Sequence, residues 1–349
     1  MTAHPTAAPG TSADPGPRAL LAMPEGLQTR MFSPQQLQDL QDLVQIDIER
    51  TCPDLSAAGD ADPALLAEAE IVLTGWGSPL IDAEALARMP RLRAIVHTAG
   101  TIRSTVGPAV WEHGGIRVTS STEANAVPVA EFALAQILLA GKRSLAREHA
   151  YRRDQQVRSG AAASPEIGNY GGVVGLIGAS RIGVLVAEHL RRFDLEVLIT
   201  DPYVEAEVIS ALGATKVEPE ELYSRSDVVS LHAPDVPSTQ GMVTRELLGR
   251  MRDGTTFLNT ARPALVDLDA LREELVSGRL AAVLDVHDDL ADDDPIWHAP
   301  YASITPHIAG SQGNELHRMG AQALEEVRRL AAGEPALHPV DPTRLDITA

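Results

Sequence analysis

A short segment, Gly178-Ala179-Ser180-Arg181-Ile182-Gly183, has the residue types and spacing of a loop that binds a pyrophosphate. It directly follows an apolar run, residues 173–177, and opens a stretch with helical spacing. Glycine at the first position allows a tight turn, and glycine at the last lets helix and strand pack closely, so that the first N–H groups of the helix can face the phosphates. Ser180 replaces the usual middle glycine, and its hydroxyl can donate to a phosphate oxygen. The segment predicts a dinucleotide-binding turn; the alternative is a glycine-rich turn without a ligand.

An acidic residue follows the next expected strand. Asp201 comes directly after residues 196–200 and lies 18 residues after Gly183. A carboxylate at that place accepts hydrogen bonds from the ribose hydroxyls of an adenosine and repels a 2′-phosphate, which favours NAD over NADP. The alternative is an incidental surface aspartate.

Two further side chains suit the chemistry of a carboxylic acid. Arg262 follows an expected strand that ends in Asn259, and its guanidinium can hold a carboxylate through two parallel hydrogen bonds. His307 is the candidate proton donor and acceptor, because histidine is the residue type whose ordinary pKa lies closest to neutral pH. Taken alone, each has a plainer interpretation, a surface ion pair for the arginine and a structural role for a histidine that follows proline.

The elements that must position these residues alternate between strands and helices, a pattern typical of βαβ units and mostly parallel sheets. A polar break over residues 142–170 separates two such series, and the second begins near residue 172. Strands are expected at 18–23, 71–74, 92–96, 173–177, 196–200, 228–231, 256–259 and 281–286, and helices at 37–44, 82–89, 130–140, 182–193, 206–212 and 268–277.

Composition excludes several classes of protein. The chain has 349 residues, 44% of them hydrophobic, and a net charge of −19, which disfavours nucleic acids and anionic membranes as partners. Its one cysteine, Cys52, excludes intramolecular disulfides and suits a reducing cytoplasm. We find neither a secretory signal nor an apolar run long enough to cross a membrane. Residues 1–17 lack large apolar side chains, apart from Met1, and are predicted to be a disordered tail.

Several motifs occur in the order found in one family, and from about Leu20 to Pro339 the chain resembles the D-isomer-specific 2-hydroxyacid dehydrogenases. These motifs are His97-Thr98-Ala99-Gly100-Thr101-Ile102, Asn125-Ala126-Val127-Pro128-Val129-Ala130-Glu131, the loop at Gly178, Leu231-His232-Ala233-Pro234, Pro237-Ser238-Thr239-Gln240-Gly241, Asn259-Thr260-Ala261-Arg262, Leu284-Asp285-Val286 and Thr305-Pro306-His307-Ile308-Ala309-Gly310. The resemblance implies an α/β fold of two Rossmann-like doubly wound domains, with an active-site cleft between them. The expected substrate domain comprises residues 18–141 plus 305–349, and the inserted NAD-binding domain comprises 142–304.

The resemblance also implies a reaction, the transfer of a hydride between the nicotinamide of NAD(H) and C2 of a 2-oxo or 2-hydroxy acid. His307 would be the acid/base, Arg262 the clamp for carboxylate and carbonyl, and the loop of Gly100, Thr101 and Ile102 would bind the carboxylate through backbone N–H groups. The implied cofactor-binding residues are Gly178, Ser180, Arg181, Ile182, Gly183, Asp201, His232, Pro234, Thr239, Thr260, Ala261, Asp285 and Gly310. His97 would line the cleft. No metal site is expected. The resemblance implies a homodimer formed through the cofactor domain.

Two departures from the family pattern concern the catalytic residues. Pro263 stands where the family usually has glycine, and this removes an N–H next to Arg262. Leu290 stands where the family usually has the glutamate that pairs with the catalytic histidine. A gap of about two residues would align Asp289, or less well Asp288, with that glutamate; the alternative is that all five nearby aspartates are solvated. Without a carboxylate beside it, His307 would have a lower pKa.

Two other functions stay open. The family has relatives that sense NADH and act as transcriptional co-repressors, although a sensor has less need of both Arg262 and His307. It also includes formate and phosphonate oxidisers. Glyoxylate, hydroxypyruvate and phenylpyruvate are candidate substrates.

Overall fold

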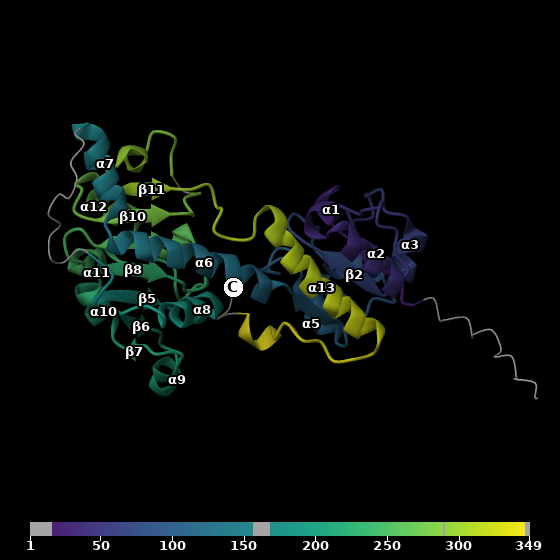
Figure 1. Cartoon of the computed structure of the whole chain (residues 1–349). Helices are drawn as coiled ribbons and strands as arrows, with labels where there is room; N and C mark the ends of the chain where they lie inside the picture. The colour runs from purple at the N-terminus through teal and green to yellow at the C-terminus, as the bar shows by residue number, and fades with distance from the viewer. Residues whose placement is uncertain (1–15, 156–167, 289, 346–349) are drawn as a thin grey trace, which may run out of the picture. The chain divides into compact units, whose positions relative to one another are not determined.

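The computed structural model describes residues 16–155, 168–288 and 290–345, and the chain divides into two compact units (Figure 1). The first unit contains residues up to Thr122 together with Leu316–Val340, and the second contains Glu123–Glu315 and the residues from Asp341 on. These boundaries differ from the expected ones at 141 and 305. Most of helix α6 (Thr122–Gly141) belongs to the second unit because its Ala130, Ala133 and Ile137 are buried in that unit's core. The predicted tail at 1–17 lies outside the described residues except for 16 and 17.

The first unit is built on a parallel sheet. Its strands are β1 (Ala19–Leu21), β2 (Ile71–Thr74), β3 (Ala94–His97) and β4 (Arg117–Ser120), in that order. Residues 45–51 continue the sheet beyond β1 through the parallel bridges Arg18↔Gln45 and Leu21↔Thr51. The strand order therefore reverses at β1, as it does in a doubly wound sheet. The helices of this unit are α1 (Leu27–Met31), α2 (Pro34–Leu43), α3 (Pro63–Glu68), α4 (Ala83–Arg88), α5 (Pro108–His113) and α13 (Leu316–Ala331).

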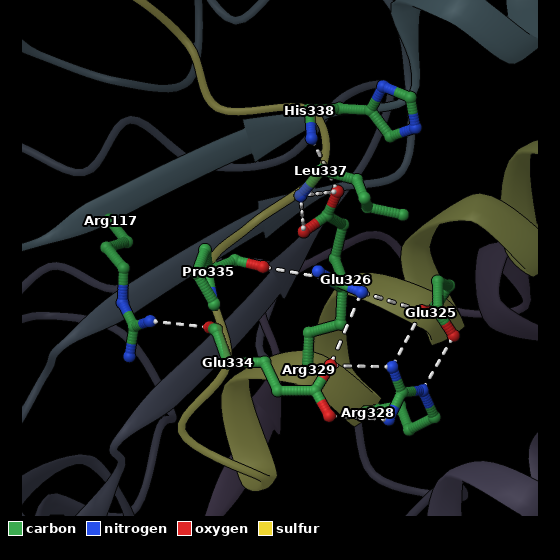
Figure 2. Close-up of polar contacts among 9 residues, drawn as sticks. All are labelled: Arg117, Glu325, Glu326, Arg328, Arg329, Glu334, Pro335, Leu337 and His338. Atoms are coloured by element: carbon green, nitrogen blue, oxygen red, sulfur yellow. Dashed lines mark hydrogen bonds and ion pairs between the residues drawn. The ribbon is translucent and has the colours of Figure 1, made fainter.

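Helix α13 returns from the far end of the sequence to cover this sheet. It packs against α1, α2, β3 and β4, and its Met319, Ala323 and Val327 are buried. The carboxylate of Glu326 is buried as well and accepts hydrogen bonds of 2.8–3.2 Å from the N–H groups of Leu337 and His338 (Figure 2). This carboxylate ties the C-terminal segment to the first unit.

The second unit holds a seven-stranded parallel sheet in the order β11-β10-β9-β8-β5-β6-β7. The strands are β5 (Gly172–Ile177), β6 (Leu195–Thr200), β7 (Thr215–Lys216), β8 (Val228–Leu231), β9 (Thr256–Asn259), β10 (Ala281–Leu284) and β11 (Ala302–Ile304). The chain order reverses between β5 and β8. In such a sheet ligands bind outside the carboxyl ends of the strands at the point of reversal.

Helices cover both faces of this sheet, and each face has its own apolar core. One core contains side chains of α6 and α8 (Arg181–Leu190), and the other contains side chains of α10 (Pro219–Arg225), α11 (Arg245–Arg250) and α12 (Leu268–Val276) (Figure 1). The remaining helices are α7 (Ser144–Asp154) and α9 (Ala206–Ala211). The expected α/β fold with two doubly wound domains is confirmed.

Helix α6 corrects one expectation from the sequence. With 20 residues and a mean hydropathy of 1.4, it is long and apolar enough to cross a membrane by length and composition. A core helix of a soluble protein meets the same criterion, and α6 buries Ala130, Ala133 and Ile137 in the second unit. The helix also contains Glu123 and Glu131. Packing on the sheet accounts for part of this apolar character, since 39% of the most apolar 18 residues of the helix are buried.

Candidate active site

The phosphate loop at the end of β5 has the geometry that its glycines predict. Gly178 adopts φ +95°, and a Cβ there would lie 3.0 Å from the backbone nitrogen of Ala233. A Cβ on Gly183 would collide with the carbonyl oxygen of Gly178. Ser180 caps helix α8, and its Oγ accepts a hydrogen bond from the Gly183 N–H at 3.4 Å. The loop is thus a close strand-to-helix turn with the start of α8 behind it, the arrangement that binds a pyrophosphate.

Asp201 joins the end of β6 to this loop. Its Oδ2 accepts a hydrogen bond from the Ala179 N–H at 2.8 Å, and its Oδ1 accepts one from the Tyr203 N–H at 2.8 Å. Oδ1 also accepts from the Val204 N–H at 3.2 Å, and a carboxylate has about four acceptor positions, so one remains for a ribose hydroxyl. The same carboxylate therefore shapes the phosphate loop and can still bind the adenosine. Arg181, the first residue of α8, forms an ion pair with Glu123.

Two buried polar atoms that follow the neighbouring strands β8 and β9 have no hydrogen-bond partner among the residues that the structure describes. They are Nδ1 of His232, just after β8, and Oγ1 of Thr260, just after β9. Burial lowers the pKa of His232 to about 4, so its ring is neutral near pH 7, and its Nε2 lies 2.9 Å from the Ser230 hydroxyl. Buried polar groups without a partner are uncommon in proteins. Polar atoms of a dinucleotide are suitable partners here, and the glycine turn leaves room for its phosphates.

The loop after β8 is held by Thr239. Its hydroxyl donates to the carbonyl oxygen of Pro234 at 2.6 Å and accepts from the Val236 N–H at 3.1 Å. Thr239 and Pro234 thus contact each other in the segment that follows His232.

Arg262 follows β9 in a turn that Asn259 organises. The Asn259 side chain accepts a hydrogen bond from the Ala261 N–H at 2.9 Å and donates to the Arg262 carbonyl at 3.1 Å. Pro263 begins a short 3₁₀ helix, Pro263–Leu265, at a position where a missing N–H is tolerated. The proline thus continues the turn without leaving a hydrogen bond unmade. Within the described part of the chain the guanidinium forms no ion pair, so its charge is available to a ligand.

His307 has an unusual backbone conformation, and Asp285 holds the segment around it. The φ angle of His307 is +54°, a left-handed value that residues other than glycine rarely adopt. The buried carboxylate of Asp285, after β10, accepts hydrogen bonds from the Thr305 hydroxyl at 2.6 Å and from the N–H groups of Ile308 and Ala309 at 2.8 Å. The His307 side chain itself is exposed.

The carboxylate-binding loop expected in the first unit follows β3. The Thr98 N–H donates to the Thr74 carbonyl at 2.7 Å, and the Thr122 hydroxyl donates to the Gly100 carbonyl at 3.0 Å. The N–H groups of Thr101 and Ile102 donate to no other residue that the structure describes. They are therefore available to an anion.

His97 is the buried residue that precedes this loop. Its Nδ1 lies 2.9 Å from the Thr74 hydroxyl. Burial lowers its pKa to about 4, and an interaction with the backbone of Thr101 opposes the shift. The ring is therefore neutral near pH 7 and belongs to the interior of the first unit.

The chain is similar in sequence to proteins of one known family. The family model of the D-isomer specific 2-hydroxyacid dehydrogenase NAD binding domain matches residues 135–309. The chain is also 33% identical over 238 residues to the hydroxypyruvate reductase of Thermotoga maritima, a match that covers 67% of this chain and 76% of that protein. The chain belongs to the D-isomer specific 2-hydroxyacid dehydrogenase family.

The chain is also similar to family members with other names. It is 33% identical over 282 residues to the D-3-phosphoglycerate dehydrogenase of Mycobacterium tuberculosis, a match covering 80% of this chain but 51% of that protein, so the chain spans about half the length of that relative. The D-lactate dehydrogenase of Aquifex aeolicus, solved with NAD and lactic acid, superposes with a TM-score of 0.66 at 27% identity and covers 91% of this chain and 96% of that one. The predicted family and the predicted NAD cofactor are confirmed.

The segment around Leu290 departs from the family pattern, and the structure describes it on both sides of residue 289. Leu290 packs against the apolar core of the second unit, together with Leu271 and Leu284. Asp288 is exposed and forms no ion pair with His307. Asp289, predicted to pair with His307, lies outside the described residues, so that pairing stays a prediction.

Another aspartate of this segment is not solvated. Asp294 is buried, and its carboxylate accepts hydrogen bonds from Arg272 Nε at 3.0 Å and Nη2 at 2.8 Å. The Arg272 guanidinium lowers the pKa of Asp294. The alternative in which all five aspartates are solvated is therefore wrong for this one.

Two residues that support the His307 segment were missed as contributors by sequence reasoning. The Nε2 of His287 lies 3.1 Å from the Thr305 carbonyl oxygen, and its ring contacts Trp297 edge to face. Asn125 accepts a hydrogen bond from the Ser311 N–H at 3.1 Å, next to Gly310. Asn125 lies within one of the motifs quoted above, and His287 directly follows another. Their roles depend on tertiary contacts, which the motifs do not reveal.

Proposed function

We propose that this protein is an NAD(H)-dependent D-2-hydroxyacid dehydrogenase that reduces 2-oxo acids. The observation that carries the proposal is the arrangement at one edge of the second sheet. Strands β9, β10 and β11 are neighbours, and after their carboxyl ends come Arg262, Asp285 and His307. Backbone hydrogen bonds of 3.0 Å from Asp285 to Asn259 and from His307 to Asp285 join these three strand ends.

In this proposal Arg262 binds the carboxylate and the carbonyl oxygen of the substrate through its forked N–H groups. Two parallel hydrogen bonds fix the plane of the acid and so orient C2. The positive charge also stabilises the negative charge that develops on the carbonyl oxygen during reduction. When bound beside this arrangement, NADH would supply a hydride to C2.

His307 is the proposed proton donor in reduction and acceptor in oxidation. Its imidazolium passes one proton to the carbonyl oxygen, which becomes the hydroxyl of the product. The Asp285 carboxylate fixes the loop that carries this histidine, and one of its acceptor positions remains for the nicotinamide carboxamide. Thr101 and Ile102 offer N–H groups to the substrate carboxylate.

The test is NADH consumption by the purified protein across a set of 2-oxo acids, with Arg262→Ala and His307→Ala as variants. We expect turnover by the wild type, and a loss of about 100-fold or more in kcat for each variant. NADH binding, followed by its fluorescence, should stay within about threefold because neither side chain shapes the phosphate loop. NADH binding without turnover of any acid would contradict the proposed activity and favour a sensor.

We further propose a cytoplasmic homodimer. Helix α7 has no fully buried side chain within one chain and exposes Tyr151, which makes it suited to contact a second copy. The single buried Cys52 suits a reducing compartment. Sedimentation of the purified protein tests the dimer, and a monomer at micromolar concentration would contradict it.

A further inference from the structure

The second unit contains a cavity at the edge of its sheet where the strands begin. The volume of this cavity is about 240 Å³. Thr256 and Ala281, the first residues of the parallel neighbours β9 and β10, line it. The proposed catalytic residues Arg262, Asp285 and His307 instead follow the carboxyl ends of β9, β10 and β11. The length of the strands therefore separates the cavity from the proposed active site.

The walls of the cavity are largely apolar. Leu145 of α7 and Val283 of β10 line it, and so does Tyr301, which precedes β11. The Tyr301 ring contacts His149 of α7 edge to face, with the ring centroids 6.0 Å apart, so α7 is held against this wall. An apolar cavity of about 150 Å³ is large enough for benzene. A cavity of about 240 Å³ therefore has room for a ring-sized apolar group and a carboxylate.

Arg143, between α6 and α7, supplies a positive charge to this cavity. Its guanidinium lies against Gly254, because a Cβ on Gly254 would be 3.0 Å from Cζ and Nη1 of the arginine. Within the residues that the structure describes, the Arg143 side chain forms neither an ion pair nor a hydrogen bond. A guanidinium in such a position can bind a carboxylate through two parallel hydrogen bonds.

The first turn of α7 adds hydrogen-bond donors to the same wall. Ser144, Leu145 and Ala146 are the first three residues of this 11-residue helix, and all three line the cavity. Their N–H groups donate to no acceptor in the described part of the chain. The start of a helix carries a partial positive charge. The helix and the guanidinium thus favour an anion at one end of a cavity whose other walls are apolar.

We propose that this cavity is a second ligand site, which binds a small carboxylic acid with an apolar body. Arg143 binds the carboxylate, and Leu145 and Val283 cover the apolar part. The walls have few hydrogen bonds to offer the remaining oxygens of a phosphate, so a carboxylate suits the site better. Because the cavity and the catalytic residues are at opposite ends of the strands, the ligand is an effector rather than the substrate. The inference does not depend on the proposed function.

The experiment measures the binding of benzoate to the full-length protein by isothermal titration calorimetry, with acetate and inorganic phosphate as comparison ligands. Arg143→Asn removes the charge, and asparagine tolerates the left-handed backbone of this residue, whose φ is +48°. Ala146→Phe fills the cavity from its rim. Arg147→Gln, at an exposed position of α7, is the matched control. NADH binding within about threefold of the wild type shows that each variant is folded.

We expect benzoate to bind the wild type with a Kd of about 1 mM or lower, and acetate and phosphate to bind at least about tenfold more weakly. Arg143→Asn and Ala146→Phe should each weaken benzoate binding by about tenfold or more, because one loses the charged hydrogen bonds and the other the space. Arg147→Gln should stay within about twofold. Benzoate at saturation should leave NADH affinity unchanged within about threefold.

Arg262→Ala distinguishes this site from the proposed active site. Benzoate binding that disappears in Arg262→Ala but persists in Arg143→Asn would place the ligand at the active site and overturn the inference. Phosphate binding tighter than that of benzoate would also overturn it. An absence of benzoate binding to the wild type would overturn it as well, and a dimer in sedimentation would then identify a second copy as the group that covers the cavity. None of these measurements requires turnover, so each result is independent of the proposed activity.

Discussion

A single carboxylate explains the conformation of the proposed catalytic histidine. The left-handed backbone of His307 is unfavourable by about 1–2 kcal/mol for a residue other than glycine. Asp285 offsets this through one hydroxyl and two N–H groups on either side of the histidine. Strained residues of this kind persist where the surroundings determine them fully, which is typical of functional sites.

Replacement of Asp285 by asparagine tests that dependence. The Asp285→Asn side chain keeps one acceptor oxygen and brings an NH₂ group toward N–H donors, so the loop should lose its fixed geometry. We expect kcat to fall by about 100-fold, within the usual contribution of a positioned proton donor, while NADH affinity falls by less than about tenfold. Steady-state kinetics and NADH fluorescence measure the two effects. Asp292→Asn, at an exposed position, is the control; unchanged kcat in Asp285→Asn would show that His307 does not need this support.

At the scale of elements, the 3₁₀ helix Pro295–His298 is fixed to α12 by the Asp294–Arg272 pair. Asp294 also caps that helix by accepting from the Ile296 N–H at 2.9 Å. Because the carboxylate is buried, Asp294→Ala leaves the cap without a partner and the Arg272 guanidinium with only the exposed Asp269, and should lower the free energy of unfolding by about 2–4 kcal/mol. Asp293→Ala, next to it and exposed, should change it by less than about 0.5 kcal/mol. Urea denaturation measures both, and equal effects would contradict the assigned roles.

The sequence predicts strands far better than it predicts the contacts that shape the site. The buried strands β5, β8 and β9 lie within a residue of the expected ranges because each is a short run centred on buried apolar side chains. The left-handed His307 could not be predicted, since it depends on a carboxylate 22 residues earlier in the chain. The extent of α6 was also missed, because Pro128 obscures its first turns.

At the scale of the whole molecule, two buried histidines make stability depend on pH. Burial lowers the pKa of His97 in the first unit and of His232 in the second to about 4, while an unfolded histidine titrates near 6.5. Between these values the unfolded chain binds more protons than the folded one, so stability rises with pH. Each residue contributes up to about 3 kcal/mol at neutral pH that is lost progressively as the pH falls from about 6.5 to about 4.

Urea denaturation between pH 4.5 and 7.5 measures this dependence. The His97→Gln variant should show a flatter profile than the wild type, because one of the two protonation sites that oppose folding is gone. His113→Gln, an exposed position, is the control and should keep the wild-type slope. A wild-type profile without slope below pH 6.5 would contradict the assignment of both rings as neutral when folded.

The path of the chain through the two units has a consequence for biosynthesis. The sheet of the first unit needs α13, where Gly320 packs so closely that a Cβ would collide with the carbonyl oxygen of Met31. The residues up to 122 therefore leave the ribosome long before α13, the helix that covers them. By contrast, residues 123–315 of the second unit are contiguous in the sequence. At typical elongation rates the 218 residues from 122 to 340 take about 10–40 s. During that interval the nascent first unit exposes the apolar face that α13 later covers, so chaperone supply rather than intrinsic stability should limit the yield of soluble protein.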